Sequence, residues 1–266
     1  MTDLSIAELA ELALGLTGLA LLWRLVLCPA ARARPATARL VRWEIAPVDF
    51  SLEVWGVLAA GFVAQILAGA AAKVAGLAGD AYFVAAAPAM PAGMLLACVM
   101  FQRRARAAGD PPQFGGSFFR AGAAAFLVFL PVMAVVWVAW NLLLTAIGLP
   151  ATQQDVVDDF IRMKSPGLRA TLAAYAIVLA PLAEEWVFRG VLFRFARGRL
   201  PRWGALVLPS AVWASLHGLT AFAPLLALGV VLSLAYERTG NLAVPMLAHA
   251  LFNLNTILLL LAGAGG

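Results

Sequence analysis

The chain has 266 residues, of which 63% are hydrophobic and only 12% are charged. A soluble domain carries about twice that share of charged residues, so the composition excludes an ordinary soluble protein and indicates an integral membrane protein. The formal net charge of +5 comes almost entirely from arginine, and no segment alternates basic and aromatic residues in the way that nucleic-acid-binding segments do. We therefore expect membrane lipid as a partner, and no nucleic acid.

Long apolar runs separated by charged clusters predict an all-α fold, a polytopic membrane helical bundle of about eight transmembrane helices. We expect the spans at 4–27, 52–72, 81–101, 121–147, 168–189 with an extension towards 195, 203–217, 222–236 and 242–261. The span at 203–217 is short enough to be re-entrant. Residues 1–167 then form four N-terminal helices and a polar connection, and residues 168–266 form a helical core that we expect to hold the active site.

The distribution of arginine predicts how the chain is oriented. Arginines crowd the connections 28–51, 102–120 and 190–202, whereas the connections 73–80 and 148–167 carry a single lysine or a balanced mixture of charges. By the positive-inside rule the basic connections lie in the cytoplasm, so both termini of an eight-span chain lie outside. The alanine- and arginine-rich composition is typical of a high-GC bacterium, so we expect a bacterial inner membrane.

Two adjacent carboxylates, Glu184 and Glu185, end the apolar run 171–183. An ionised side chain near the bilayer centre costs on the order of 3 kcal/mol, so the pair needs a reason to be there. Arg189 follows Glu185 by four residues, so the two share a helix face and can form a buried, forked ion pair. Glu184 is rotated about 100° from that face and is free to act as a general base. The alternative is that both carboxylates are structural.

Both histidines of the chain lie in short apolar segments downstream of the carboxylates. Trp213 and His217 are four residues apart, and so are His249 and Asn253, which places each pair on one helix face. His249 and Asn253 can both donate hydrogen bonds to one developing oxyanion. Each pair alone could equally be a packing contact between helices. A carboxylate, a histidine, and a histidine with an asparagine on three helices together predict a site that activates water and stabilises an oxyanion.

These three motifs resemble those of the CAAX-protease and bacteriocin-processing family (CPBP, or Abi) of intramembrane endopeptidases, which includes the Ras-converting prenyl-protein peptidase. The similarity covers about 168–258 and rests on Glu-Glu-x-x-x-Arg, aromatic-x-x-x-His and His-x-x-x-Asn in that order. The chain departs from the family at Trp213, where the family usually has phenylalanine. Because one aromatic ring replaces another, we expect the helix face to be unchanged.

The resemblance implies an intramembrane endopeptidase that processes a protein C-terminal tail or a peptide precursor. Glu184 would be the general base, and His217 would help to hold the attacking water. His249 and Asn253 would form the oxyanion hole. Three residues would support these catalytic groups: Glu185, Arg189 and Trp213.

The family has been described both as metal-dependent and as a metal-free glutamate peptidase. By residue type, Glu184, His217 and His249 could ligate Zn²⁺. However, no His-x-x-x-His pair lies on one helix, and no cysteine is close in sequence to any of the three. We therefore expect no cofactor, with zinc as the alternative.

The competing function comes from a different class, a non-hydrolytic membrane protein. It would be a bacteriocin self-immunity factor, or a transporter that uses Glu184 and the histidines as a proton relay. A transporter more often shows two related halves, and none are visible in the sequence. The sequence leaves open the substrate, the cleavage position, whether the substrate is prenylated, and the oligomeric state.

Overall fold

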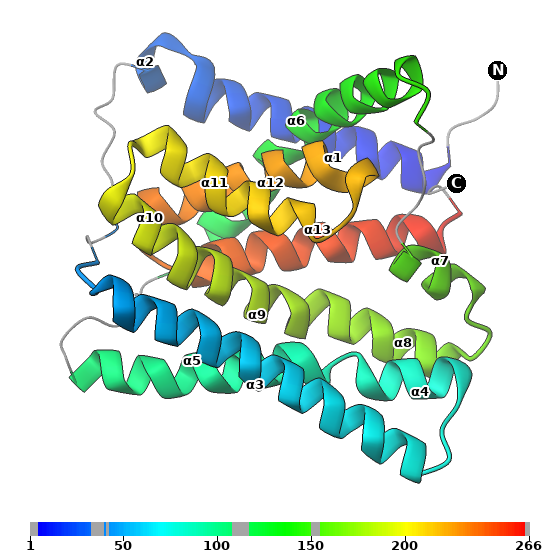
Figure 1. Cartoon of the computed structure of the whole chain (residues 1–266). Helices are drawn as coiled ribbons and strands as arrows, with labels where there is room; N and C mark the ends of the chain where they lie inside the picture. Colours follow the sequence, from blue (N-terminus) through cyan, green and yellow to red (C-terminus); the bar gives the residue numbers. More distant parts are fainter. Residues whose placement is uncertain (1–4, 33–39, 41–42, 108–116, 150–154, 264–266) are drawn as a thin grey trace.

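The computed structural model describes residues 5–32, 40, 43–107, 117–149 and 155–263, and the regular structure in these residues is entirely helical (Figure 1). This result confirms the predicted all-α membrane bundle. The α-helices are α1 (Ile6–Leu22), α2 (Pro29–Arg32), α3 (Pro47–Val74), α4 (Gly79–Ala86), α5 (Ala89–Ala107), α6 (Phe119–Ala146), α7 (Asp155–Arg162), α8 (Pro166–Ala174), α9 (Ala180–Glu185), α10 (Arg194–Arg199), α11 (Arg202–Ser215), α12 (Leu219–Thr239) and α13 (Ala243–Leu261). The π-helical segments are η1 (Trp23–Leu27), η2 (Tyr175–Leu179) and η3 (Trp186–Phe193).

The described residues contain six helical segments that are long and apolar enough to cross a membrane. They are Ile6–Leu27, Pro47–Val74, Gly79–Phe101, Phe119–Ala146, Leu219–Thr239 and Ala243–Leu261. The expected spans at 168–189 and 203–217 are not among these six, so the count of about eight stays a prediction. α11 has only 14 residues, which at 1.5 Å per residue is about 21 Å, shorter than a hydrocarbon core of about 30 Å. The segment 166–199 is helical throughout, but it carries the two carboxylates and is divided by η2 and η3.

Local sequence signals set several of the helix ends. The Ser5 hydroxyl accepts a hydrogen bond from the backbone N–H of Glu8, while the Glu8 carboxylate accepts one from the Ser5 N–H, which is a capping box at the start of α1. The Ser165 hydroxyl caps α8 by accepting from the backbone N–H of Leu168. α12 ends at Thr239 and is capped by Gly240, whose φ of 64° is a left-handed conformation that glycine adopts without strain.

The helix that carries the two carboxylates lies in the middle of the bundle (Figure 1). α3 packs on α5, α5 contacts α9, and α9 contacts α13. Beyond α13, α6 contacts both α12 and α13 and also packs against α1, while α11 contacts α12 and η3. The buried polar side chains of the described residues all lie in this second half of the chain: Glu185, Arg189, Arg194, Ser210, Ser233, Glu237, Asn241 and His249. The polar chemistry inside the bundle is therefore concentrated around α9 and its neighbours.

The described ends of the three arginine-rich connections lie at one end of the bundle, on the left in Figure 1. Residues 33–39, 41–42 and 108–116 of these connections lie outside the described residues. At this end the Glu237 carboxylate accepts hydrogen bonds from Arg197 Nε (2.6 Å) and Arg202 Nη2 (2.8 Å). Its backbone carbonyl also accepts from the N–H of Leu40. Glu237 thus joins the last turn of α12 to α10, to α11 and to the segment that precedes α3.

Replacing Glu237 with glutamine should lower the free energy of unfolding by about 2 kcal/mol, because charge-assisted hydrogen bonds from two arginines lose their anion. Asp158→Asn is a matched control, since the Asp158–Arg162 ion pair has side chains that are 37% and 76% exposed. An exposed helix pair of this kind contributes only about 0.5 kcal/mol. Reversible unfolding in mixed micelles, followed by circular dichroism, measures both variants. Equal losses in the two would contradict the anchoring role of Glu237.

Candidate active site

Glu185 is the centre of a fully buried charged cluster. Its Oε1 atom accepts hydrogen bonds from Arg189 Nη1 at 2.7 Å and from His249 Nδ1 at 2.8 Å. The exposed fractions of the three residues are 0%, 1% and 4%. The structure thus contains the predicted Glu185–Arg189 pair, although one oxygen and one nitrogen form it, so it is not the expected fork. Because a carboxylate can only accept, Nδ1 of His249 carries a hydrogen and Nε2 is the ring nitrogen left for chemistry.

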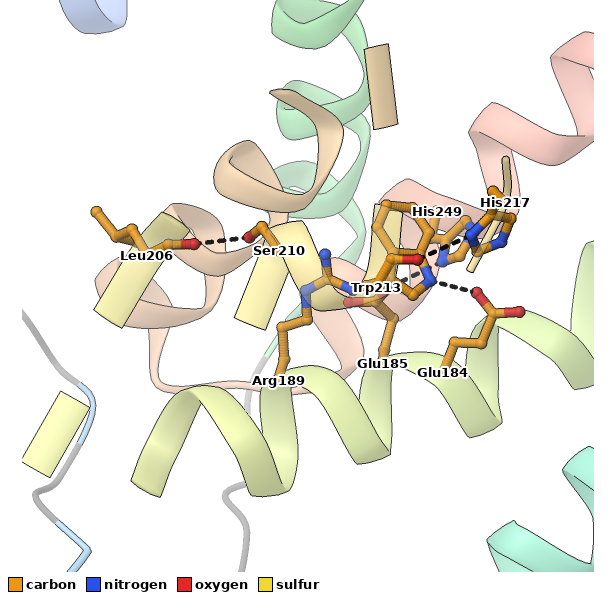
Figure 2. A network of polar contacts seen from close by, with 8 residues as sticks. All are labelled: Glu184, Glu185, Arg189, Leu206, Ser210, Trp213, His217 and His249. Carbon is orange, nitrogen blue, oxygen red and sulfur yellow. Dashed lines mark hydrogen bonds and ion pairs between the residues drawn. The ribbon is translucent and has the colours of Figure 1, made fainter. Parts of the chain in front are cut away.

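Trp213, on α11, connects the members of the site (Figure 2). Its indole Nε1–H donates a hydrogen bond of 2.7 Å to Oε2 of Glu184. The rings of His217 and His249 approach the Trp213 ring edge-on, with centroids 5.1 Å and 5.3 Å away. The Arg189 guanidinium lies over the same ring, 4.8 Å from its centroid. In the view of Figure 2, Glu184 and Arg189 lie on opposite sides of Trp213.

His217 lies just after the end of α11, before Gly218. Its Nδ1 atom is 2.9 Å from the backbone carbonyl oxygen of Trp213. Since a carbonyl oxygen only accepts, Nδ1 is the donor and the lone pair of neutral His217 is on Nε2. In the view of Figure 2, His217 lies on the same side of Trp213 as Glu184. His217 can therefore accept a hydrogen bond from a water molecule held near Glu184.

Asn253 binds the backbone of the carboxylate-bearing helix rather than a neighbouring site residue. Its Nδ2 donates a hydrogen bond of 2.7 Å to the carbonyl oxygen of Ala176, in η2. Within η2 the N–H of Ala180 bonds to the carbonyl of Tyr175, five residues earlier. The next bond of that series would come from residue 181, which is proline and has no N–H, so Ala176 needs another donor. Asn253 supplies it, and one of its two amide hydrogens is thereby used.

The guanidinium of Arg189 fits against a glycine on the neighbouring helix. A Cβ atom added to Gly229 of α12 would lie 2.7 Å from Ser210 Cβ and 3.0 Å from Arg189 Nη2. Neither contact is one that a real Cβ atom makes without displacement of its neighbours. Glycine at this position therefore allows α12, α11 and η3 to approach closely enough to enclose the charged cluster.

One further side chain near the site was not predicted from the sequence. Tyr175 lies within electrostatic range of the Glu184 carboxylate. It stands at the start of η2, nine positions before Glu184, which corresponds to no simple helical repeat because the π-helical turns shift the register. Its only sequence signal is that it is the one tyrosine in the apolar run 171–183.

The predicted metal ligands do not assemble into a metal site in this structure. Within the described part of the chain, no three or more His, Cys, Asp or Glu side chains are grouped closely enough to hold a metal ion. Glu184 accepts from Trp213 through Oε2, and both histidines use Nδ1, so each histidine keeps Nε2, the nitrogen that a zinc ligand would use. Zinc therefore stays the alternative to metal-free chemistry.

The fold and the site together define a helical membrane protein with a carboxylate–histidine centre enclosed by α9, α11 and α13. Residues 166–255 match the family model of the type II CAAX prenyl endopeptidases described as Rce1-like, which confirms the resemblance predicted from the three motifs. All seven predicted site residues fall within this range.

One curated relative is an uncharacterized 24.3 kDa protein of Escherichia coli, which is 33% identical over 123 residues. The aligned region covers 44% of this chain and 56% of that protein, so the chain spans little more than half of the relative's length. No solved structure matches the chain significantly.

The two adjacent carboxylates should differ sharply in their effect on stability. Glu185→Gln removes the anion between Arg189 and His249, and breaking a buried ion pair in this way costs about 3–5 kcal/mol. Glu184→Gln retains an oxygen that accepts from Trp213 and lies at a half-buried position, so its expected cost is below about 1 kcal/mol. Unfolding of both variants in mixed micelles measures the difference. A larger loss in Glu184→Gln would show that the roles of the two residues are assigned the wrong way round.

Proposed function

We propose that this protein is an intramembrane endopeptidase that hydrolyses a peptide bond near the membrane by a glutamate-activated water. The observation that carries the proposal is the position of Glu184, which is held by the N–H of Trp213. The ring of Trp213 also contacts His249 of α13 and His217, which follows α11. The match of residues 166–255 to an Rce1-like endopeptidase model supports the same conclusion. A transporter that only relays protons would need no hydrogen-bond donors for an oxyanion.

In the proposed first step, Glu184 takes a proton from a water molecule whose oxygen attacks the scissile carbonyl carbon. One carboxylate oxygen of Glu184 is held by Trp213, which leaves the other free for the water. His217 accepts the second water hydrogen at Nε2, because its Nδ1 hydrogen is bound to the Trp213 carbonyl. The two acceptors orient the oxygen lone pair towards the substrate.

In the same step the carbonyl oxygen becomes an oxyanion, which needs donors in a site that excludes water. We assign this role to Nε2–H of His249 in its imidazolium form, whose Nδ1–H is bound by the Glu185 carboxylate. The amide hydrogen of Asn253 that is not used by Ala176 is the second donor. When the C–N bond breaks, the leaving amine takes the proton from Glu184, which restores the carboxylate.

The proposed substrates are C-terminal tails of membrane-associated proteins or peptide precursors. Placing the arginine-rich end of the bundle in the cytoplasm, by the positive-inside rule, gives the proposed orientation. We propose a bacterial inner membrane as the location, with both termini outside. The division of the chain into 1–167 and a catalytic core at 168–266 is likewise a proposal.

Glu184→Gln should lower kcat by at least about 100-fold, because the general base is lost. The assay uses the full-length protein in liposomes with a farnesylated peptide ending in a CAAX sequence and the same peptide without the lipid, and mass spectrometry of the products. Glu53→Gln is the control, since Glu53 is a half-buried carboxylate on α3, outside the site. Cleavage at the wild-type rate by Glu184→Gln would refute the mechanism.

The metal-free chemistry predicts full activity in protein that elemental analysis shows to be free of zinc. The physical reason is that the Glu184 carboxylate can take the proton from water itself, so no metal-bound hydroxide is needed. Treatment with phenanthroline and dialysis should leave kcat unchanged. Loss of activity on chelation, followed by recovery with Zn²⁺ alone, would instead establish a zinc enzyme.

A further inference from the structure

We propose that Trp213 is a positioning residue that sets the reactive state of both water-holding groups, Glu184 through its indole N–H and His217 through its backbone carbonyl. The inference deepens the proposed function and rests on it. From the sequence, Trp213 is an aromatic spacer that any large ring could replace. In the structure its nitrogen has a specific task that phenylalanine cannot perform.

The indole is a hydrogen-bond donor to the carboxylate at a fixed place. Trp213 Nε1 donates a hydrogen bond of 2.7 Å to Oε2 of Glu184. A hydrogen bond to an ionised carboxylate is short and strong, and it favours the charged form that a general base requires. Because the bond is made to Oε2, it also directs Oε1 away from Trp213, towards the place of the water.

The indole cannot easily turn away from this position. Trp213 is 1% exposed, and three charged or polar side chains surround its ring. The Arg189 guanidinium lies over the ring face, while the rings of His217 and His249 meet it at interplanar angles of 63° and 80°. The N–H is therefore fixed in direction before the substrate arrives, which is what electrostatic preorganisation requires.

The same residue fixes the tautomer of His217. The Trp213 carbonyl oxygen binds Nδ1 of His217 at 2.9 Å, four residues along the chain. A shift of the Trp213 backbone would release both the carboxylate and the imidazole together. Trp213 thus couples the orientation of two groups that the mechanism needs at one water molecule.

Several other titratable groups face Glu184 and would contribute to its pH response. Arg189 and Glu185 lie on the same helical stretch, and the Arg189 charge interacts with Glu184. Tyr175 of η2 interacts electrostatically with Glu184, and the two histidines, His217 after α11 and His249 of α13, contact the Trp213 ring that holds it. Among the residues of α5 whose side chains are described, the only titratable group is the Cys98 thiol. Trp213→Phe leaves all of these groups in place, so it isolates the N–H.

The experiment compares Trp213→Phe with Trp140→Phe in the full-length protein. Trp140 Nε1 also donates to an oxygen, the Leu219 carbonyl at 3.0 Å, so the control loses a hydrogen bond of the same kind outside the site. The first readout is the infrared C=O band of the protonated Glu184 carboxyl, identified by its absence from Glu184→Gln and followed against pH. The second readout is the pH dependence of kcat/KM with the farnesylated and unmodified peptides.

In Trp213→Phe the midpoint of the infrared titration and the acid limb of kcat/KM should both move to higher pH by about one unit, since the ionised carboxyl loses its donor. At neutral pH, kcat should fall about tenfold with little change in KM, because the substrate still binds but the water is misplaced. Trp140→Phe should leave both midpoints unchanged.

An unshifted infrared midpoint in Trp213→Phe would overturn the inference, even if the variant were less stable or less active. If the infrared midpoint shifts in Trp213→Phe but the wild-type protein cleaves neither peptide, the peptidase assignment is overturned. The role of the Trp213 hydrogen bond to the Glu184 carboxylate would still be supported. A shift of equal size in Trp140→Phe would overturn the inference, because the effect would not depend on the Trp213 N–H.

Discussion

The buried Glu185 carboxylate is the interaction on which the site depends. It compensates Arg189 and receives the Nδ1 hydrogen of His249, so it links η3 to α13 within the bundle. Without that anion, two cationic or polar groups would be buried without a partner, which is costly in any protein interior and more so in a membrane. The hydrogen bond to Glu185 therefore holds the His249 ring in one orientation. That orientation leaves Nε2 as the atom that can donate to the oxyanion.

A second constraint comes from proline in the helix that bears the carboxylates. Pro181 removes one backbone donor, the π-helical turn η2 accommodates the change, and Asn253 supplies the replacement hydrogen bond to Ala176. This bond joins α13 to the carboxylate-bearing helical stretch at a second point, in addition to the bond between His249 and Glu185. Trp213 of α11 completes the enclosure. The three motifs are far apart in sequence because each lies on a different helical segment, and the three segments together enclose the site.

Much of this arrangement could be predicted from the sequence, because helical spacing is a local property. The Glu185–Arg189 pair follows from a separation of four residues. The polar residues within apolar segments also lie mostly in the second half of the chain, which the sequence shows directly. Two of the eight predicted spans, 168–189 and 203–217, are not among the six helices long and apolar enough to cross a membrane, because α11 is short and the stretch 166–199 carries two carboxylates and π-helical turns. The bond between Asn253 and Ala176, and the direction of the Trp213 N–H, depend on the rotation of helices against one another, which periodicity does not specify.

The central claim is that Glu184, and not Glu185, acts on the water that attacks the substrate. The most direct measurement is a structure of the Glu184→Gln variant with an uncleaved peptide substrate bound. Our account predicts a water about 3 Å from both the substituted side chain at position 184 and the scissile carbonyl carbon, with the carbonyl oxygen directed at His249 Nε2. A scissile carbonyl placed away from the substituted side chain, or a water held instead by Glu185, would contradict the account.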